Sequence, residues 1–353
     1  MHALQILAGT RALERIREHQ FKPDDIRLIL GASGGPRWFV LSHLDQLIAR
    51  ELLPQIKRPV HLAGSSIGAW RMACYAAPDP VAALKRLEDH YLHQSFPKGM
   101  TPQAVTDQCA DMLSEVLGPD YRPQINRLLH IITARCKGRT MEEDHWQQFY
   151  AFALVASGNA LSRRTLRWHF DRHLVQSQPG SLPVKGFADF RTTASQLNHD
   201  NLFPALMASA AIPMAMAGIA SIPGSSPGPY RDGGMVDYHF DLPFETPDGV
   251  ILYPHFQPQL KPGWFDKQLR WRRVKARNYK DVVLLTPSPA FIEKLPYGKV
   301  PDRRDFHKMT DADRITYWKR SVQAGERLAE EFNEWVSGGG SASMVKPLIP
   351  SKL

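Results

Sequence analysis

The pentapeptide Gly64-Ser65-Ser66-Ile67-Gly68 is the strongest constraint on how this 353-residue chain folds. It directly follows the largely apolar run 60–63, which is typical of a buried β-strand. A Gly-x-Ser-x-Gly sequence after a strand is typical of a nucleophile elbow, a turn so tight that only glycines fit on either side of the exposed serine. Ser66 is therefore the candidate nucleophile. Because glycine and serine also fill ordinary turns, the pattern needs support from elsewhere in the chain.

A second glycine-rich turn lies upstream of the elbow. Residues 26–30 form a buried-strand pattern, residues 31–37 read Gly-Ala-Ser-Gly-Gly-Pro-Arg, and a helix is predicted over 38–47. Successive N–H groups of such a turn point at one spot, which suits a phosphate or the oxyanion of an acyl-transfer intermediate. The loop has neither a Gly-x-Gly-x-x-Gly pattern nor a Gly-Lys-Ser/Thr ending. An oxyanion hole paired with the serine elbow is thus the favoured interpretation.

A third turn, Asp232-Gly233-Gly234, follows a small-residue helical pattern over 205–211 and the turn at Pro213. An aspartate before two glycines is compatible with a plain Asx turn. In a chain with a serine elbow, a carboxylate hydrogen-bonded to the serine can serve as its base when the site supplies the remaining stabilisation. Asp232 is therefore the candidate base.

Four short blocks occur in a recognisable order. They are the Gly-Gly-x-Arg loop at 34–37, the elbow at 64–68, Ala-Ser-Ala-Ala-Ile-Pro at 208–213 and the Asp-Gly-Gly turn at 232–234. In this order the blocks resemble the patatin-like phospholipase family. The resemblance covers the stretch 26–245. It implies a patatin-like α/β/α sandwich of three layers with a mostly parallel central sheet.

The resemblance also implies a role for each matching residue. Ser66 would be the nucleophile and Asp232 the base of a dyad without histidine. The N–H groups of Gly34 and Gly35 would form the oxyanion hole, with Arg37 shaping the loop. The elbow and turn glycines are Gly64, Gly68, Gly233 and Gly234. The implied substrates are phospholipids or related acyl glycerides, and neither a metal nor another cofactor is implied.

Two positions depart from the family's pattern. Trp38 follows Arg37 where the family usually has another glycine, which predicts a tighter loop or one partly covered by the indole. Residues 235–240 lack the Asn and Pro that tend to follow the Asp-Gly-Gly turn, and Pro243 comes late. What holds Asp232 in place is therefore left open.

Strand and helix patterns alternate along much of the chain. Strands are expected near 26–31, 58–63, 127–134, 249–254 and 281–286. This alternation predicts a mostly parallel sheet covered on both faces, with active groups at the carboxyl ends of the strands.

We expect three parts in the chain. These are an N-terminal helical extension over 1–25, a catalytic domain over 26–290 and a C-terminal extension over 291–353. The last holds an amphipathic helix over 311–336, docked on the sheet, and a flexible tail. The hydrophobic content of 43% permits one large core with an appendage. Segment 214–229 is loop-like, either a mobile lid or a plain surface loop.

The net charge of +9 favours an anionic partner. Eight basic residues lie within 261–280, against Asp266 alone, with aromatic residues between them. Such a run suits peripheral contact with an anionic membrane, whereas a solvated helix with aromatics packed on the core is the plainer alternative. No nucleic-acid-binding module accompanies the run, so no nucleic acid is expected. The aromatic-rich helical pattern over 141–162 predicts core, with the wall of an acyl channel as the alternative.

Three cysteines and fourteen histidines show no metal-ligand spacing, so no metal site is predicted. The sequence has no apolar stretch of membrane-spanning length, and its first residues lack the basic-then-apolar order of a signal peptide. We expect a cytoplasmic protein, with contact to a membrane only at its periphery.

Three hypotheses about function follow. The first is a lipid acyl hydrolase that forms an acyl-enzyme on Ser66. The second is a conventional α/β-hydrolase with His239 or His255 as base, although only two predicted strands precede Ser66 where that fold builds several. An acyltransferase or a small-ester esterase would share the elbow. The third is a lipid-binding protein without catalysis, which does not explain why the serine, the aspartate and the glycine pair are all present.

Overall fold

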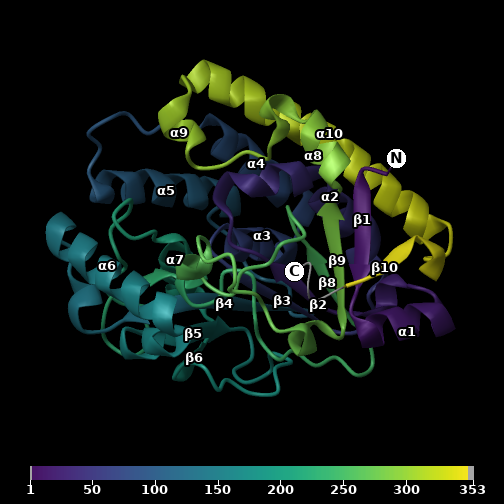
Figure 1. The fold of residues 1–353 in the computed structure, drawn as a ribbon, viewed down its shortest axis with the longest axis horizontal. Coiled ribbons are helices and arrows are strands. Elements are labelled where there is room, and N and C mark those ends of the chain that lie inside the picture. The colour runs from purple at the N-terminus through teal and green to yellow at the C-terminus, as the bar shows by residue number, and fades with distance from the viewer. Residues whose placement is uncertain (1, 349–353) are drawn as a thin grey trace.

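The structure is a computed structural model that describes residues 2–348. One large β-sheet forms its centre (Figure 1). The sheet has ten strands in the order β10-β1-β9-β8-β2-β3-β4-β5-β6, and β7 pairs with β4 outside this order. The strands are β1 (Leu4–Ala8), β2 (Ile26–Gly31), β3 (Val60–Ser65), β4 (Arg127–Cys136), β5 (Phe170–Gln176), β6 (Thr192–Gln196), β7 (Tyr230–Asp232), β8 (Val250–Pro254), β9 (Val282–Pro287) and β10 (Val345–Pro347). Most neighbours are parallel; β1 with β9, β4 with β5 and β4 with β7 are antiparallel. The predicted α/β fold is therefore confirmed.

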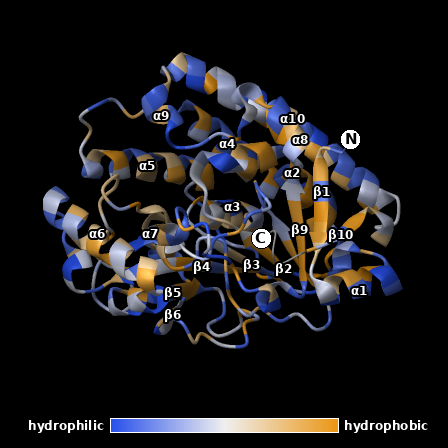
Figure 2. Cartoon of the chain, viewed as in Figure 1, coloured by the Kyte–Doolittle hydropathy of each residue, from blue (hydrophilic) through white to orange (hydrophobic). Residues whose placement is uncertain are grey.

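Helices pack against this sheet. The α-helices are α1 (Thr10–His19), α2 (Ser42–Leu47), α3 (Ile67–Ala76), α4 (Pro80–His93), α5 (Pro102–Leu117), α6 (His145–Leu161), α7 (His199–Ala210), α8 (Pro289–Lys294), α9 (Asp305–Lys308) and α10 (Asp311–Ser337). Helix α3 packs on β2, β3 and β4, and α7 packs on β4 and β7. Strands β8 and β9 are buried at every residue, as expected for parallel strands covered on both faces. Figure 2 shows β1 and β9 as mostly hydrophobic, whereas α10 is largely hydrophilic along its outer surface.

The five predicted strands correspond to β2, β3, β4, β8 and β9. The expected helical extension over 1–25 is wrong at its start, because residues 4–8 form β1 inside the sheet, between β9 and β10. Alternate residues of this short apolar segment are buried, and α1 follows it. Three strands therefore precede Ser66, instead of the two that were predicted.

Helix α10 agrees with the amphipathic helix predicted over 311–336. It packs mainly on α2 and on the 3₁₀ helix Gly35–Leu41, and it reaches the sheet at β1. There the buried Glu331 accepts hydrogen bonds from the backbone N–H groups of Ala3 and Leu4, at 3.0 and 2.9 Å. The predicted flexible tail is wrong for residues 345–347, which form β10, and its last part, 349–353, lies outside the described residues.

The structure bears on the alternatives raised for two further segments, 261–280 and 141–162. Residues 261–280 form loops with short 3₁₀ turns at Trp264–Asp266 and Ala276–Tyr279, so the solvated helix is wrong. In α6 only one side packs on the core, through residues such as Phe152, whereas Trp146 and Tyr150 are 65% and 67% exposed. The prediction of core therefore holds for one face of this helix.

Residues 2–348 lack two features, a membrane-spanning helix and a metal cluster. No helix in that range is both long and apolar enough to cross a membrane. The same range contains no group of three or more His, Cys, Asp or Glu side chains placed to hold a metal ion.

Candidate active site

Strand β4 brings the elbow and the Asp-Gly-Gly turn together. One edge of β4 pairs with β5, and the other pairs first with β3 and then with β7. At the junction Ser65 lies opposite Ile132, and Asp232 lies opposite Thr133. The ends of β3 and β7 therefore meet at consecutive positions of β4, although 166 residues separate Ser66 from Asp232.

The hydroxyl of Ser66 donates a hydrogen bond to Asp232 Oδ2 at 2.8 Å. Ser66 caps α3 with φ 57° and ψ −136°, a backbone conformation that is rare for residues other than glycine and costs about 1–3 kcal/mol. Its N–H donates to Ser209 Oγ at 2.9 Å, and Ser209 Oγ donates to the carbonyl of Ile132 at 2.7 Å. Ser209 belongs to the segment 208–213, so that block anchors the strained turn to β4.

Glycines allow the elbow to lie against the neighbouring strand. A Cβ atom on Gly68 would lie 1.8 Å from the carbonyl oxygen of Gly31, and one on Gly64 would lie 2.4 Å from the carbonyl oxygen of Gly68. Real Cβ atoms do not approach backbone so closely. The first turn of α3 can therefore pack onto β2 and β3 only with glycine at these positions.

Asp232 is held on both sides of its carboxylate. Oδ2 accepts from Ser66, and Oδ1 accepts from the N–H of Gly234 at 2.7 Å. Its own N–H donates to the carbonyl of Ala211 at 3.0 Å. A Cβ atom on Gly233 would lie 2.1 Å from the carbonyl oxygen of Ile132. Burial raises the pKa of Asp232 above 3.8, and the positive charge of Arg303 acts in the opposite direction.

The loop at 34–37 leads into the 3₁₀ helix Gly35–Leu41. Across residues 2–348, the N–H groups of Gly34 and Gly35 have no hydrogen-bond acceptor. Gly35 has φ 57°, and Gly34 lies against the ring of Phe256, which a Cβ atom would approach to 2.4 Å. The guanidinium of Arg37 lies over the same ring, 5.5 Å from its centroid. The loop is thus fixed from one side by Phe256.

Trp38 does not cover this loop. Its indole is fully buried in the core and stacks on Phe39 with ring centroids 5.1 Å apart. From Gly35 onward the backbone follows a 3₁₀ helix, and a loop tighter than the family's stays a prediction.

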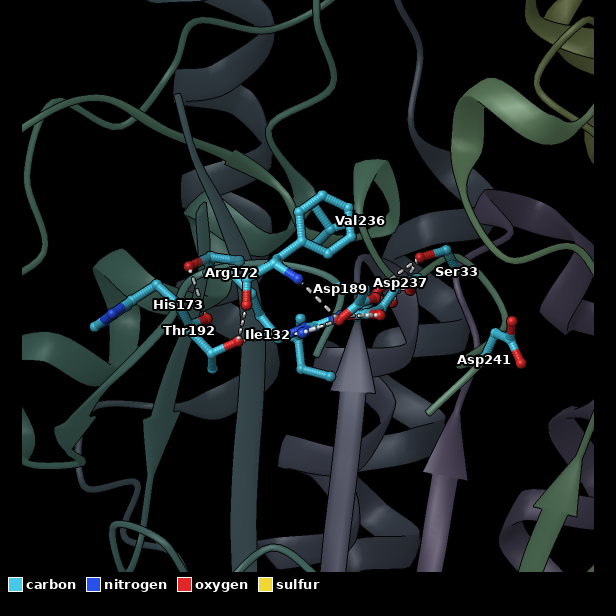
Figure 3. A network of polar contacts seen from close by, with 12 residues as sticks. Ser33, Ile132, Arg172, His173, Asp189, Thr192, Val236, Asp237 and Asp241 are labelled. Carbon is cyan, nitrogen blue, oxygen red and sulfur yellow. Dashed lines mark hydrogen bonds and ion pairs between the residues drawn. The ribbon is translucent and has the colours of Figure 1, made fainter. Parts of the chain in front are cut away.

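An ion-pair network supports the residues after Asp232, where the sequence left the support open (Figure 3). The buried Arg172 contacts Asp237 through two hydrogen bonds of 2.5 and 2.9 Å and pairs with Asp189 through two more. The carbonyl of Asp237 accepts from Ser65 Oγ at 2.9 Å. The network therefore ties the segment after Asp232 to the residue just before Ser66.

The two histidines of the alternative hypothesis form hydrogen bonds with groups other than Ser66 and Asp232. His239 Nδ1 accepts from the N–H of Lys261 at 3.0 Å, and His255 Nδ1 donates to the carbonyl oxygen of Gln257 at 2.5 Å. Burial lowers the pKa of His239 well below 6.5 and the pKa of His255 to about 3. In residues 2–348 neither ring is hydrogen-bonded to Ser66 or Asp232.

Two cavities meet at Ser66. The larger, of about 1030 Å³, has a largely apolar wall. Its apolar lining includes Trp70, Phe96, Met100, Val105, Ile212 and Phe306. The smaller, of about 430 Å³, is lined mainly by polar side chains together with Ser66 and Asp232. Residues 214–216, at the start of the predicted loop 214–229, line the larger cavity, and the N–H of Met214 donates to Gln148 on α6.

Sequence reasoning missed several residues at these cavities. Arg303 lines both of them, and Tyr238 lines the smaller one. Lys267 appeared in the sequence only as part of a charged run. No pattern marks Arg303, because it lies in an irregular segment before α9 and reaches the site only through the tertiary fold.

Comparison with known protein families gives a match over the part of the chain that holds the elbow and the Asp-Gly-Gly turn. The sequence model of a family described as Patatin-like phospholipase matches residues 40–244, more than half of the chain. The matched range contains Ser66 and Asp232 but neither the loop at 34–37 nor the segments around Lys267 and Arg303. A search of curated proteins found no match.

Proposed function

The chain belongs to the patatin-like phospholipase family, which indicates lipid acyl hydrolase activity, and we propose that it cleaves carboxylic esters of phospholipids or related acyl glycerides through Ser66 and Asp232. The observation that carries this proposal is the 2.8 Å hydrogen bond from the Ser66 hydroxyl to the Asp232 carboxylate, at the junction of an apolar and a polar cavity.

The proposed reaction proceeds in two halves. Ser66 Oγ attacks the carbonyl carbon while its proton passes to Asp232, and the bond to the alcohol then breaks as Asp232 returns that proton to the leaving oxygen. Water next attacks the acyl-enzyme, Asp232 receives its proton, and Ser66 regains a proton as the free acid leaves. Because burial raises the pKa of Asp232, its carboxylate is a stronger base than an exposed aspartate.

The N–H groups of Gly34 and Gly35 are the proposed donors to the oxyanion. Loss of one such donor typically costs about 2.7–4 kcal/mol of transition-state stabilisation. Ser66 also stands at the N-terminus of α3, where the helix dipole favours negative charge. Nucleophile, base and donors all come from the chain's own groups, so the proposed mechanism uses no metal. We place the acyl chain in the cavity of about 1030 Å³, whose apolar wall begins beside Ser66.

Hydrolysis of a short p-nitrophenyl ester tests the proposal. Ser66→Ala is expected to abolish turnover, and Asp232→Asn to lower kcat by about 10²–10⁴-fold because the amide cannot accept the proton. His239→Asn and His255→Asn serve as matched controls, because an Asn side chain can accept or donate a hydrogen bond near the position of Nδ1 and is not a base. An essential histidine together with a dispensable Asp232 would overturn the dyad. Product analysis by mass separates release of free acid from transfer to a second acceptor.

We also propose that the basic segment 261–280 contacts an anionic membrane. Trp271 is 68% exposed, and Arg270, Lys275 and Arg277 are exposed beside it. Aromatic rings and cations together favour the headgroup region of anionic bilayers. Cosedimentation with phosphatidylserine vesicles should weaken in Trp271→Ser. Loss of binding in a Trp146→Ser/Tyr150→Ser variant of α6 instead would move the contact to that helix.

A further inference from the structure

The smaller cavity beside Ser66 carries an excess of positive charge. Five cationic side chains line it against two carboxylates. The cations are Arg37, Lys261, Lys267, Arg303 and Arg304, and the carboxylates are Asp232 and Asp302. A concentration of like charge in a cleft with polar walls is costly unless an anion is bound, so the imbalance calls for a ligand.

In residues 2–348, one of these five cations, Arg304, lies within ion-pair distance of a carboxylate. Arg304 pairs with Asp302 at 2.9 Å, and Lys261 Nζ donates to the carbonyls of Leu269 and Arg272. By contrast, no carboxylate in residues 2–348 lies within ion-pair distance of Lys267 or Arg303. Lys267 Nζ lies 4.2 Å from the centroid of the Tyr238 ring, and its pKa is lowered by burial and by the nearby charge of Arg303. A bound anion would counter the repulsion from Arg303 and favour the charged form of Lys267.

The position of Arg303 relates this charge to the reaction. Arg303 lines both cavities, as do Ser66 and Gly35. A Cβ atom on Gly35 would lie 3.1 Å from Arg303 Nε, so the guanidinium lies against the proposed oxyanion loop. When the ester carbonyl lies at Ser66 and the acyl chain occupies the apolar cavity, the alcohol side of the ester lies in the cationic cavity.

We propose that the smaller cavity is an anion subsite that recognises a phosphate group on the leaving alcohol, through Lys267 and Arg303. The inference rests on the proposed function and adds to it the two residues that would favour its phospholipid substrates over neutral acyl glycerides. Ammonium and guanidinium groups form charge-assisted hydrogen bonds with phosphate oxygens, and guanidinium binds two of them at once. The volume of about 430 Å³ lies in the range of small-ligand sites.

Both recognition residues lie outside the range that matches the family. The match ends at residue 244, whereas Lys267 and Arg303 come from later segments of the chain. The subsite is thus a property of this chain's own C-terminal third, which also packs α10 against the oxyanion loop.

The test compares two water-soluble esters with the same acyl chain, monohexanoyl glycerol and monohexanoyl glycerol 3-phosphate, below their micelle concentrations. Wild-type protein should show kcat/KM about tenfold or more higher for the phosphorylated ester, because that ester alone offers a phosphate for charge-assisted hydrogen bonds. Lys267→Met and Arg303→Met should each lower this ratio about tenfold. The ratio removes any effect that the variants have on the dyad, since that effect is common to both esters.

Matched controls are Lys319→Met and Arg320→Met, which change the same residue types on the exposed face of α10. Both should keep the wild-type ratio. Inorganic phosphate is also tested as an inhibitor of neutral-ester hydrolysis. This test distinguishes a phosphate on the substrate from free phosphate as the ligand of the cavity. Competitive inhibition that weakens in Lys267→Met, together with preference for the phosphorylated ester, supports the subsite. Inhibition without that preference would assign the cavity to free phosphate and overturn the proposal.

Failure of this inference is distinguishable from failure of the proposed function. Cleavage of both esters at equal kcat/KM, unchanged in Lys267→Met and Arg303→Met, overturns the subsite and leaves the hydrolase intact. Cleavage of neither ester, together with no difference between wild-type protein and Ser66→Ala, overturns the proposed function itself.

Discussion

At the scale of single residues, Ser66 and Asp232 are both kept in states that an exposed residue would avoid. Ser66 is held at φ 57° and is 3% exposed, and Asp232 is 8% exposed. The strain points the hydroxyl at the carboxylate, and burial strengthens that carboxylate as a base. Hydrogen bonds offset each cost: Ser209, from another segment, supports the turn, and Gly234, two residues further along the same turn, supports the carboxylate.

The raised pKa of Asp232 predicts the acidic side of the pH profile. Because only the ionised carboxylate can take the proton of Ser66, kcat/KM should fall as pH drops through a pKa above 3.8. The measurement is kcat/KM for a neutral ester between pH 3.5 and 9, in wild-type protein and in His239→Asn. An acidic limb at or below 3.8, or one that disappears in His239→Asn, would contradict the assignment of the limb to Asp232.

At the scale of elements, the site depends on how closely α3, β2 and β4 approach one another. Gly68 and Gly31 let the first turn of α3 touch β2, and β4 aligns the ends of β3 and β7.

Gly68→Ala is therefore expected to destabilise the protein by about 3 kcal/mol or more, because the new Cβ would lie 1.8 Å from a backbone oxygen. The free energy of unfolding is measured by urea titration. Gly158→Ala, within α6, is the matched control, since its Cβ would meet only a side-chain oxygen at 3.1 Å, and we expect a change within about 1 kcal/mol. Equal stability of the two variants would show that the close approach at the elbow is not required.

Much of the arrangement around the elbow was predictable from sequence, and particular residues explain the rest. The parallel strands β2, β3, β8 and β9 have the apolar runs that buried strands require. Strand β5 escaped prediction because its buried Arg172 and Asp171 look exposed in sequence; the partners of Arg172, Asp189 and Asp237, are distant along the chain. Arg303 could not be found for the same reason, since only the tertiary fold brings it to the site.

At the scale of the whole molecule, both ends of the described chain are joined to the core. Strand β1 lies between β9 and β10, and α10 covers the 3₁₀ helix that begins at Gly35. Gly325 of α10 lies so close to that helix that a Cβ would be 2.5 Å from the carbonyl oxygen of Val40. The proposed oxyanion loop is thus supported by a helix far from it in sequence.

This packing predicts that the C-terminal segment does not unfold separately. Phe332→Ala removes a fully buried ring of α10 that faces Phe21 and Trp335, and should cost about 3–5 kcal/mol. Tryptophan fluorescence and circular dichroism during urea unfolding should shift together to lower urea. A separate early transition, with the main one unchanged, would mean that α10 is an independent appendage.

The most direct test of the central claim is the rate at which a fluorophosphonate modifies the protein, followed by intact mass. Wild-type protein should gain one adduct, located on Ser66, and Ser66→Ala should gain none at that position. Asp232→Asn should react at least about 100-fold more slowly, whereas His239→Asn and His255→Asn should react at rates close to wild type. Undiminished labelling of Asp232→Asn, or labelling that depends on either histidine, would contradict the account.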